Sequence, residues 1–417
     1  MLAGLYDEAA AAYTAALAER DSDAELHAGL IHALVAAKKS KRAAEAAKTA
    51  RDRFPDDPHV MAAHAGVLFR QAHLPEASNG YQQAITKNPR IPEAWAGMAR
   101  FYSAMSMPAT AENFFRSAFR LEPNSAGLAH VYSNLTDDDE EHIRRLETAL
   151  ALYGEKAEPV PHLRVHIESD KLLRGRKLRD LKSPYGPYEM PLVELKETPA
   201  RRDGWALDVR FNGKGRARLL VDTGASGILL GANAVKKFGL EVLSNEKTEM
   251  RGIGDDKKPK TSATLAKSVS VGDFQLENVP VSVSESRRIG ANDGLIGTDV
   301  FRRFLVTMDP RRSKFRLAPM DKADDDSPRD RHRTEANKHF TAVTRAGSHF
   351  FLPVGINGKA SAMFLIDTGA FANLLSEDLS RKVTKLARED RVQIQGVSGK
   401  VNKVSVSYTH LTLPTKA

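Results

Sequence analysis

Residues 218–226 read Arg-Leu-Leu-Val-Asp-Thr-Gly-Ala-Ser, and residues 363–371 read Met-Phe-Leu-Ile-Asp-Thr-Gly-Ala-Phe. Each stretch is a short apolar run, typical of a buried strand, that ends in an acid, a hydroxyl and a glycine. The glycine has no Cβ atom and therefore lets backbone N–H groups approach the carboxylate of Asp222 or Asp367. The two stretches predict two similar strand-and-turn units, each of which places one carboxylate at a sharp turn.

The similarity extends beyond the motif without a gap, at a constant offset of 145 residues. Six residues before the first motif recur before the second: Val209, Asn212, Gly213, Lys214, Ala217 and Leu220 return as Val354, Asn357, Gly358, Lys359, Ala362 and Leu365. After the motif, Leu229 and Leu230 return as Leu374 and Leu375. A single Asp-Thr-Gly is an ordinary turn sequence, but a match of this length indicates an internal duplication.

Residues around both motifs have the alternation of β-strands. Trp205, Leu207, Val209 and Phe211 alternate with polar or small residues, and Asn212-Gly213 then predicts a tight hairpin turn. Further strands are expected at residues 268–271, 279–283, 304–309 and 314–317. In the second copy the hairpin recurs around Asn357-Gly358, and we expect the duplication to stop near residue 406, leaving this copy without its final third.

Bulk properties narrow the classes of function. The 417 residues are enough for two or three domains, and the absence of cysteine excludes thiol catalysis, cysteine-based zinc sites and disulfides. The net charge is +9, but the basic residues are scattered, with the densest clusters at 171–182 and 329–333 in stretches typical of connectors. We therefore expect no nucleic-acid surface. No apolar run is long enough to predict a transmembrane helix.

The first residues of the chain are the part of the sequence that bears on its compartment. The N-terminus lacks the layout of a signal peptide, and a periplasmic or secreted location would require a signal in a preceding segment.

The first 152 residues are rich in alanine and repeat every 34 residues. Small residues recur in two series, Ala9, Ala43, Ala77, Ala111 and Ala16, Ala50, Ala84, Ala118, and Pro55, Pro89 and Pro123 end the units. This pattern resembles the tetratricopeptide repeat, and the best unit carries Trp95, Met98, Ala99, Tyr102, Ala111, Phe115, Ala118 and Pro123 at the family's positions. The resemblance implies an all-α solenoid, which either supports its neighbour or binds a partner protein in its groove.

The composition divides the chain into six segments. We expect a helical-repeat domain over 1–152, a proline-containing linker over 153–190, a first β lobe over 191–320, a charged linker over 321–336 and a partial second lobe over 337–406. Residues 407–417, SYTHLTLPTKA, continue neither pattern and resemble read-through from an adapter.

Two glycine-containing elements follow the first motif in order: Gly252-Ile253-Gly254 and Leu295-Ile296-Gly297. In the second copy Gly396-Val397 falls at the place of the first element. With the Asp-Thr-Gly motifs, this order is similar to the retropepsin-type aspartic proteases, here duplicated in one chain as in the pepsin group. The resemblance implies an all-β acid-protease fold with one complete and one partial lobe, in which Gly252 to Gly254 and Gly396-Val397 are the tips of flaps.

By this resemblance Asp222 and Asp367 are the catalytic dyad. Two carboxylates so close cannot both ionise easily, so the pair shares one proton and supplies both a base for water and an acid for the carbonyl oxygen. Thr223 and Thr368 would hydrogen-bond across the lobe interface, and Gly224 and Gly369 would present N–H groups to the acids. Ser226 would donate to the outer oxygen of Asp222, whereas the second copy has Phe371 there.

The expected reaction is therefore hydrolysis of peptide bonds in a polypeptide substrate, with no metal or organic cofactor. One alternative pairs Asp222 with Asp222 of a second molecule in a homodimer. Another is a non-catalytic scaffold in which lobes and repeats grip extended peptides. Metal-dependent hydrolysis is the third alternative, and His27, His32, His339 and His349 offer no pair at ligand spacing for it.

Overall fold

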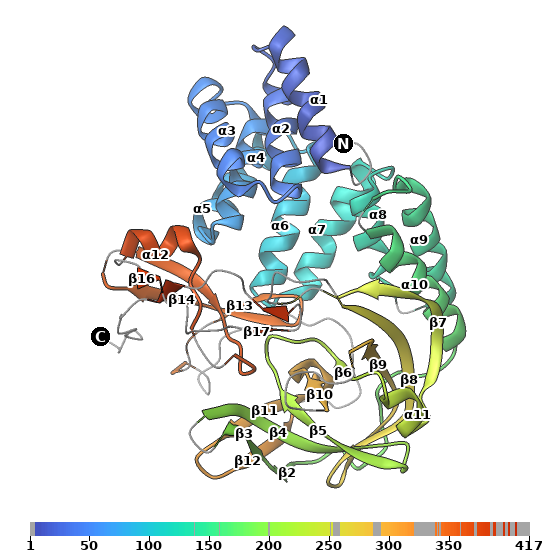
Figure 1. The fold of residues 1–417 in the computed structure, drawn as a ribbon. Coiled ribbons are helices and arrows are strands. Elements are labelled where there is room, and N and C mark those ends of the chain that lie inside the picture. The colour runs from blue at the N-terminus through green and yellow to red at the C-terminus, as the bar shows by residue number, and fades with distance from the viewer. Residues whose placement is uncertain are drawn as a thin grey trace. The chain divides into compact units, whose positions relative to one another are not determined.

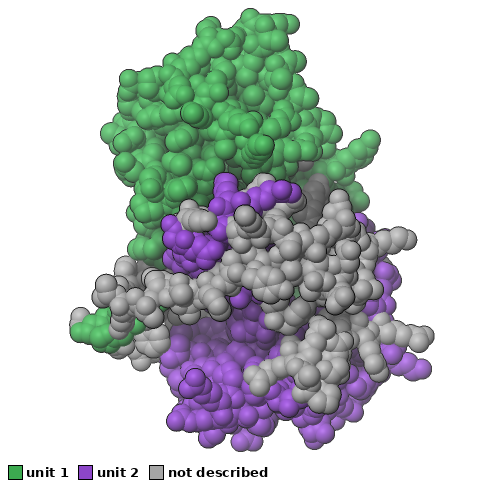
Figure 2. Space-filling view, turned by 60° about the vertical axis from the view of Figure 1, so that its left-hand side comes forward, with its two compact units in different colours: residues 1–174, 328–341 green, residues 175–327, 342–417 purple. Residues whose placement is uncertain are grey.

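The structure is a computed structural model that describes residues 5–136, 138–157, 159–198, 201–250, 252, 259–286, 293–320, 338–339, 341, 343–358, 360–370, 373–383, 387–388, 395–396, 399–400 and 405–406. The chain forms two compact units, residues 1–174 with 328–341 and residues 175–327 with 342–417 (Figure 2). The first unit is helical and the second consists mainly of strands (Figure 1). An all-α solenoid followed by all-β protease-like lobes, as the sequence predicts, is therefore confirmed.

Ten helices form the described part of the first unit, and successive helices pack on one another. They are α1 (Tyr6–Glu19), α2 (Ala24–Ala36), α3 (Ser40–Arg53), α4 (Pro58–Arg70), α5 (Leu74–Lys87), α6 (Pro92–Ala104), α7 (Pro108–Leu121), α8 (Ala126–Ser133), α9 (Asp139–Leu152) and α10 (Pro159–Leu173). Side chains cap the N-termini of two of these helices. The Asp23 and Asp57 side chains accept hydrogen bonds from N–H groups in the first turns of α2 and α4. Proline opens α4, α6 and α7, where its missing N–H costs nothing.

Large and small residues alternate where consecutive repeats meet. Tyr81 of α5 is buried, and a Cβ atom on Gly97 of α6 would lie 2.1 Å from the Tyr81 ring. Two repeats earlier, a Cβ atom on Gly29 would lie 2.4 Å from the ring of Tyr13. These helices approach each other closely because the glycine leaves room for the ring.

In the repeat between these two, small residues occupy both sides of the corresponding helix contact. Ala47 of α3 and Ala63 of α4 stand at the positions of the tyrosine and the glycine, and both are buried in one core cluster. Other members of the alanine series are also buried: Ala43, Ala50, Ala77, Ala84, Ala111 and Ala118. The 34-residue repeat read from the sequence thus marks the contact surfaces of the helices.

Residues 153–190, where the proline content predicts a linker, contain helix α10 and strands β1 and β2. Pro159 and Pro161 lie in the first turn of α10, where proline is compatible with a helix. Leu163 and Ile167 of α10 pack on Ile143 and Leu146 of α9 in a small apolar core. The helical array therefore continues to Leu173.

The second unit contains nineteen strands in the residues that the structure describes. They are β1 (Asp180–Leu181), β2 (Tyr188–Pro191), β3 (Val193–Thr198), β4 (Arg201–Phe211), β5 (Gly215–Val221), β6 (Ile228–Leu230), β7 (Glu241–Glu249), β8 (Lys260–Val271), β9 (Phe274–Ser284), β10 (Gly294–Ile296), β11 (Phe304–Asp309), β12 (Lys314–Pro319), β13 (Thr344–Ala346), β14 (His349–Ile356), β15 (Ala360–Leu365), β16 (Ala387–Arg388), β17 (Gln395–Gly396), β18 (Gly399–Lys400) and β19 (Ser405–Val406). The short helices α11 (Ala234–Phe238) and α12 (Glu377–Val383) accompany them.

Six strands of the first lobe close a ring by pairing in the order β9-β6-β10-β5-β4-β8 and back to β9. Most of these pairs are antiparallel, but β5 with β10 and β6 with β9 are parallel. Phe211, Phe274, Phe301 and Phe315 lie in its core, each almost fully buried. At about 1.5–3 kcal/mol for each fully buried side chain, these rings contribute substantially to the stability of the lobe.

The duplication is visible in the hydrogen-bonding register. In the first copy Ala206 pairs with Leu220 across β4 and β5, and in the second copy Phe351 pairs with Leu365 across β14 and β15. Shifting the first pair by 145 residues gives the second pair. The turns match as well, since Asn212 and Asn357 have φ angles of 52° and 51°. Asparagine and glycine are the residues that tolerate such a turn.

The asparagines of these turns also tie the hairpins to the following helices. The Asn212 side-chain amide donates to the carbonyl of Phe238 in α11 over 3.0 Å, and that of Asn357 donates to the carbonyl of Val383 in α12 over 3.3 Å. The similarity of the two copies therefore includes the helices α11 and α12. The expected charged linker 321–336 and the tail 407–417 lie outside the described residues.

No helix in the described part of the chain combines the length and the apolar character needed to span a bilayer.

The Tyr81–Gly97 contact provides a stability test. Gly97→Ala should lower the free energy of unfolding by about 1–3 kcal/mol, because the new methyl group overlaps the Tyr81 ring. Gly127→Ala in α8 is the matched control: no atom lies within 4 Å of its Cβ position, so better helix propensity should raise stability by about 0.5–1 kcal/mol. Urea unfolding followed by far-ultraviolet circular dichroism measures both.

Gly97→Ala in a Tyr81→Ala background places alanine at both contact positions, as Ala47 and Ala63 do one repeat earlier. In this background the substitution should be neutral or should raise the free energy of unfolding. An equal loss in both backgrounds would contradict the packing argument.

Candidate active site

Asp222 lies directly after β5, beside the glycine-containing element predicted from the sequence. Leu295 and Ile296 belong to β10, which pairs with β5 on one side and β6 on the other. The N–H of Asp222 donates to the carbonyl of Ile296 over 3.0 Å. Leu295 and Ile296 thus extend the ring of strands up to Asp222, and the hydrogen bond to Ile296 fixes the backbone of Asp222.

Gly297 ends this element at a position too crowded for a side chain. A Cβ atom there would lie 2.5 Å from Oδ1 of Asp299 and 2.6 Å from the carbonyl oxygen of Ala225. The N–H of Gly297 donates to the Gly227 carbonyl over 2.7 Å, and the N–H of Gly227 donates to Oδ1 of Asp299 over 2.8 Å. These bonds close the turn that follows the first Asp-Thr-Gly motif.

Thr223 and Thr368 join the two copies by four reciprocal hydrogen bonds. The Thr223 hydroxyl accepts the N–H of Thr368 over 3.0 Å and donates to the carbonyl of Ile366 over 2.6 Å. The Thr368 hydroxyl accepts the N–H of Thr223 over 3.1 Å and donates to the carbonyl of Val221 over 2.8 Å. Each hydroxyl therefore holds the backbone on both sides of the other copy's acid.

The two glycines of the motifs allow the acids to approach each other. A Cβ atom on Gly224 would lie 2.8 Å from Cγ of Asp367, and one on Gly369 would lie 2.7 Å from Cγ of Asp222. Each carboxylate thus packs against the glycine of the opposite copy. Any larger residue at either glycine would displace an acid.

Each carboxylate also accepts hydrogen bonds from its own turn. The N–H of Gly224 donates to Asp222 over 2.7 Å, and the N–H groups of Gly369 and Ala370 donate to Asp367 over 2.9 and 3.1 Å. Such bonds favour the ionised form. Asp367 receives two of these N–H groups and Asp222 receives one, so the two turns are not equivalent.

The pKa of Asp222 is raised to about 7. Burial is the largest cause, and the negative charge of Asp367 and a hydrogen bond with its carboxyl group add to it. The N–H of Gly224 and the positive charge of His349 act in the opposite direction but do not compensate. At acid pH Asp222 therefore holds a proton, and its hydrogen bond with Asp367 places this proton between the two acids.

The Ser226 hydroxyl has a different partner from the one expected. It contacts the hydroxyl of Ser348 from the second copy, whereas the resemblance implies donation to Asp222. Ser226 lies where the first copy meets the segment leading into β14, so a cross-copy contact replaces the bond within one copy. Phe371, its counterpart in the second copy, lies outside the described residues.

His349 is a site residue that the sequence does not indicate. It begins β14, and its Nε2 atom lies 2.9 Å from the carbonyl oxygen of Gly224. The residue at the equivalent position of the first copy is Gly204, so this contact has no symmetrical counterpart. Its signal in the sequence is the break in the duplication itself, where a glycine in one copy is replaced by a titratable side chain in the other.

The predicted flaps are only partly described. Strands β7 and β8 form a long hairpin, and the N–H of Met250 donates to the carbonyl of Pro259 near its tip. Gly252 is exposed, whereas Ile253 and Gly254 lie outside the described residues. In the second copy Gly396 pairs with Gly399 across β17 and β18, and Val397 lies outside the described residues.

Two family models match the sequence of this chain. A sequence model of the aspartyl protease family matches residues 207–300 and 352–416, which include both Asp-Thr-Gly motifs. A model of the tetratricopeptide repeat matches residues 1–67. The chain joins tetratricopeptide repeats to an aspartyl protease region. No curated protein matches the chain.

Parts of the chain are also similar to solved structures. A retropepsin-like aspartic protease from Rickettsia conorii is 18% identical, with 33% of this chain and 94% of that chain covered and a TM-score of 0.25. A tetratricopeptide-repeat protein of Thermus thermophilus is 22% identical, with 41% and 92% covered and a TM-score of 0.32. A structure of pilF from Pseudomonas aeruginosa is 19% identical, with 39% of this chain and 84% of that chain covered and a TM-score of 0.29.

The raised pKa of Asp222 predicts how the stability of the aspartyl protease region depends on pH. The folded state keeps the Asp222 proton up to about pH 7, while the unfolded chain loses it near pH 4, so stability decreases as pH rises between these values. Asp222→Asn removes this loss of stability, because asparagine does not ionise. Relative to the wild type, we expect the variant to gain on the order of 2–4 kcal/mol at pH 8 and little at pH 4.

Urea unfolding at a series of pH values measures this difference, and Asp273→Asn is the control. Asp273 is exposed in the turn between β8 and β9, so its substitution should give the same small effect at every pH. A stability difference between Asp222→Asn and the wild type that does not change with pH would contradict the proton assignment.

Proposed function

We propose that this chain is an aspartic endopeptidase that uses Asp222 and Asp367 as one intrachain dyad. The observation that supports this most strongly is the pair of acids packed on each other's glycine and joined by the reciprocal Thr223 and Thr368 bonds. This arrangement holds two carboxyl groups together with one shared proton, which is what hydrolysis by an activated water needs.

In the proposed reaction the two acids have different roles at the start. Asp222 carries the shared proton and donates it to the carbonyl oxygen of the scissile peptide bond, while Asp367 takes a proton from the attacking water. The water oxygen bonds to the carbonyl carbon and gives a tetrahedral diol. The proton on Asp367 then passes to the amide nitrogen, the C–N bond breaks, and a proton from the diol returns to Asp222.

The proposed substrate is an extended segment of polypeptide. Strands β7 and β8, and β17 and β18, form hairpins in both copies, and an extended chain can add to such edges through main-chain hydrogen bonds. Repeats of the tetratricopeptide type suggest protein–protein interaction, so we propose that the helical unit recruits the substrate or a partner protein. No step of this reaction requires a metal or an organic cofactor.

Substitution of each acid separates the intrachain dyad from the homodimer alternative. If the dyad is Asp222 with Asp367, then Asp222→Asn and Asp367→Asn should each reduce kcat for an unfolded protein or a fluorogenic peptide at least about 10³-fold. If two copies of Asp222 form the dyad, Asp367→Asn should retain activity. An equimolar mixture of the two variants should remain inactive, because neither chain contains a complete dyad.

Undiminished hydrolysis in Asp222→Asn would overturn the proposal under both pairings. Tight binding of a statine peptide, lost in either variant but with no cleavage of any peptide by the wild type, would instead favour a non-catalytic scaffold.

The contact of His349 predicts a shift in the pH profile. When protonated, His349 lowers the pKa of Asp222, so His349→Gln keeps a donor for the Gly224 carbonyl but removes the charge. The pKa of Asp222 should rise, and the alkaline limb of kcat against pH should move to higher pH by less than about one unit. The exposed His339 provides the control His339→Gln, for which no shift is expected. A shift to lower pH in His349→Gln would contradict the electrostatic role.

A further inference from the structure

Three side chains that commonly bind metal ions meet near the end of the helical unit. His142 comes from α9, and His166 and Asp170 lie one turn apart on α10. Oδ2 of Asp170 lies 3.3 Å from Nε2 of His142 and 3.5 Å from Nε2 of His166. All three ligand atoms lie within 4.8 Å of one another, and no other such group of three occurs among the residues that the structure describes.

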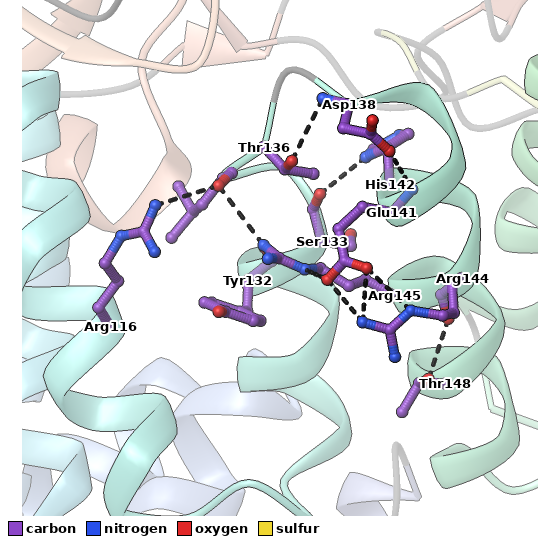
Figure 3. A network of polar contacts seen from close by, with 11 residues as sticks. Arg116, Tyr132, Ser133, Thr136, Asp138, Glu141, His142, Arg144, Arg145 and Thr148 are labelled. Carbon is purple, nitrogen blue, oxygen red and sulfur yellow. Dashed lines mark hydrogen bonds and ion pairs between the residues drawn. The ribbon is translucent and has the colours of Figure 1, made fainter. Parts of the chain in front are cut away.

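The ring of His142 is oriented by a backbone carbonyl. Its Nδ1 atom lies 2.7 Å from the carbonyl oxygen of Ser133, at the end of α8 (Figure 3). A carbonyl can only accept, so Nδ1 carries a proton, and in the neutral ring Nε2 presents a lone pair to Asp170. Fixing the far nitrogen of a histidine in this way is how proteins orient metal-binding imidazoles.

Asp170 presents an unsatisfied oxygen to this space. Its Oδ2 atom is buried and accepts no hydrogen bond of good geometry. A buried carboxylate oxygen that faces the lone pair of His142 is unfavourable unless a positive charge lies between them. The charge can be a proton on the His142 ring or a metal ion that takes the place of this proton.

Two of the three separations between the ligand atoms suit tetrahedral coordination. Zinc bound at about 2.0–2.1 Å to nitrogen and oxygen in a tetrahedron keeps its ligand atoms about 3.3–3.4 Å apart, and Oδ2 of Asp170 lies 3.3 and 3.5 Å from the two histidine nitrogens. Octahedral coordination at the same bond lengths would require about 2.9 Å between neighbouring ligands. With three protein ligands, a tetrahedral ion would have one open position.

The sequence analysis expects no metal site, and this cluster motivates the opposite hypothesis. His162-Leu163-Arg164-Val165-His166 contains a histidine pair at helical spacing, and His166 and Asp170 continue the same face of α10. His162 itself is exposed and lies outside the cluster. The third ligand comes from another helix, which no local pattern indicates.

We propose that His142, His166 and Asp170 bind one divalent transition-metal ion, with Zn²⁺ as the best fit. The ion would clamp α9 to α10 beside the small core of Ile143, Leu146, Leu163 and Ile167. Its effect would be on the stability of this helix pair, and it is independent of the two aspartates of the protease region.

The test uses the full-length chain without a histidine tag, treated with a chelator and then dialysed against Zn²⁺. Elemental analysis should give one zinc per chain, and zinc should raise the midpoint of thermal unfolding. Both effects should be lost in His142→Ala and in Asp170→Asn. They should persist in His162→Ala, the matched histidine one turn earlier on α10, and in Asp222→Asn, which alters the other candidate acid cluster.

Circular dichroism establishes that each variant is folded before zinc is measured, and replacement of zinc by Co²⁺ adds an independent readout. The visible spectrum of tetrahedral Co²⁺ is much more intense than that of octahedral Co²⁺, so an intense band in the wild type and its loss in folded His142→Ala support the site. Absence of bound zinc in the wild type would overturn the proposal and leave a protonated His142 paired with Asp170. Equal zinc binding in the wild type and His142→Ala would also overturn it.

Discussion

The protease region depends on the reciprocal hydrogen bonds between Thr223 and Thr368. Two carboxyl groups in a buried site repel each other when both are ionised, and burial raises the energy of each charge further. The threonine hydroxyls oppose this repulsion by binding the backbone at Val221 and Ile366, directly before each acid. Because the four bonds are made by backbone and short side chains, they fix the distance between the turns with little freedom.

The two copies share this frame but surround it differently. Asp222 has β10 beside it and the bond to Ile296, while Asp367 has two N–H groups from its own turn. His349 and Ser348 of the second copy reach across to the first motif, at Gly224 and Ser226. A duplicated gene thus encodes an unsymmetrical site, in which the proton has a preferred side without any change in the two acids.

Local chemistry explains which features could be predicted from the sequence. The Asn-Gly turns, the apolar strands and the Asp-Thr-Gly motifs each depend on neighbouring residues, so their patterns predict the hairpins and the position of Asp222 and Asp367. His142 and Ser348 acquire their partners only when distant segments meet, and no periodicity records that. Pro159 and Pro161 illustrate the remaining difficulty, because proline indicates a linker or a helix start and only packing on α9 decides between them.

The junctions Tyr13–Gly29 and Tyr81–Gly97 place a ring against a glycine, whereas the junction between them has Ala47 and Ala63. Recombination that joined Tyr13 to the repeat of Ala63 would set the ring against a methyl group, whereas recombination that joined it to the repeat of Gly97 would keep the glycine. Exchange of repeats within this array is therefore restricted to those that keep a glycine opposite each tyrosine.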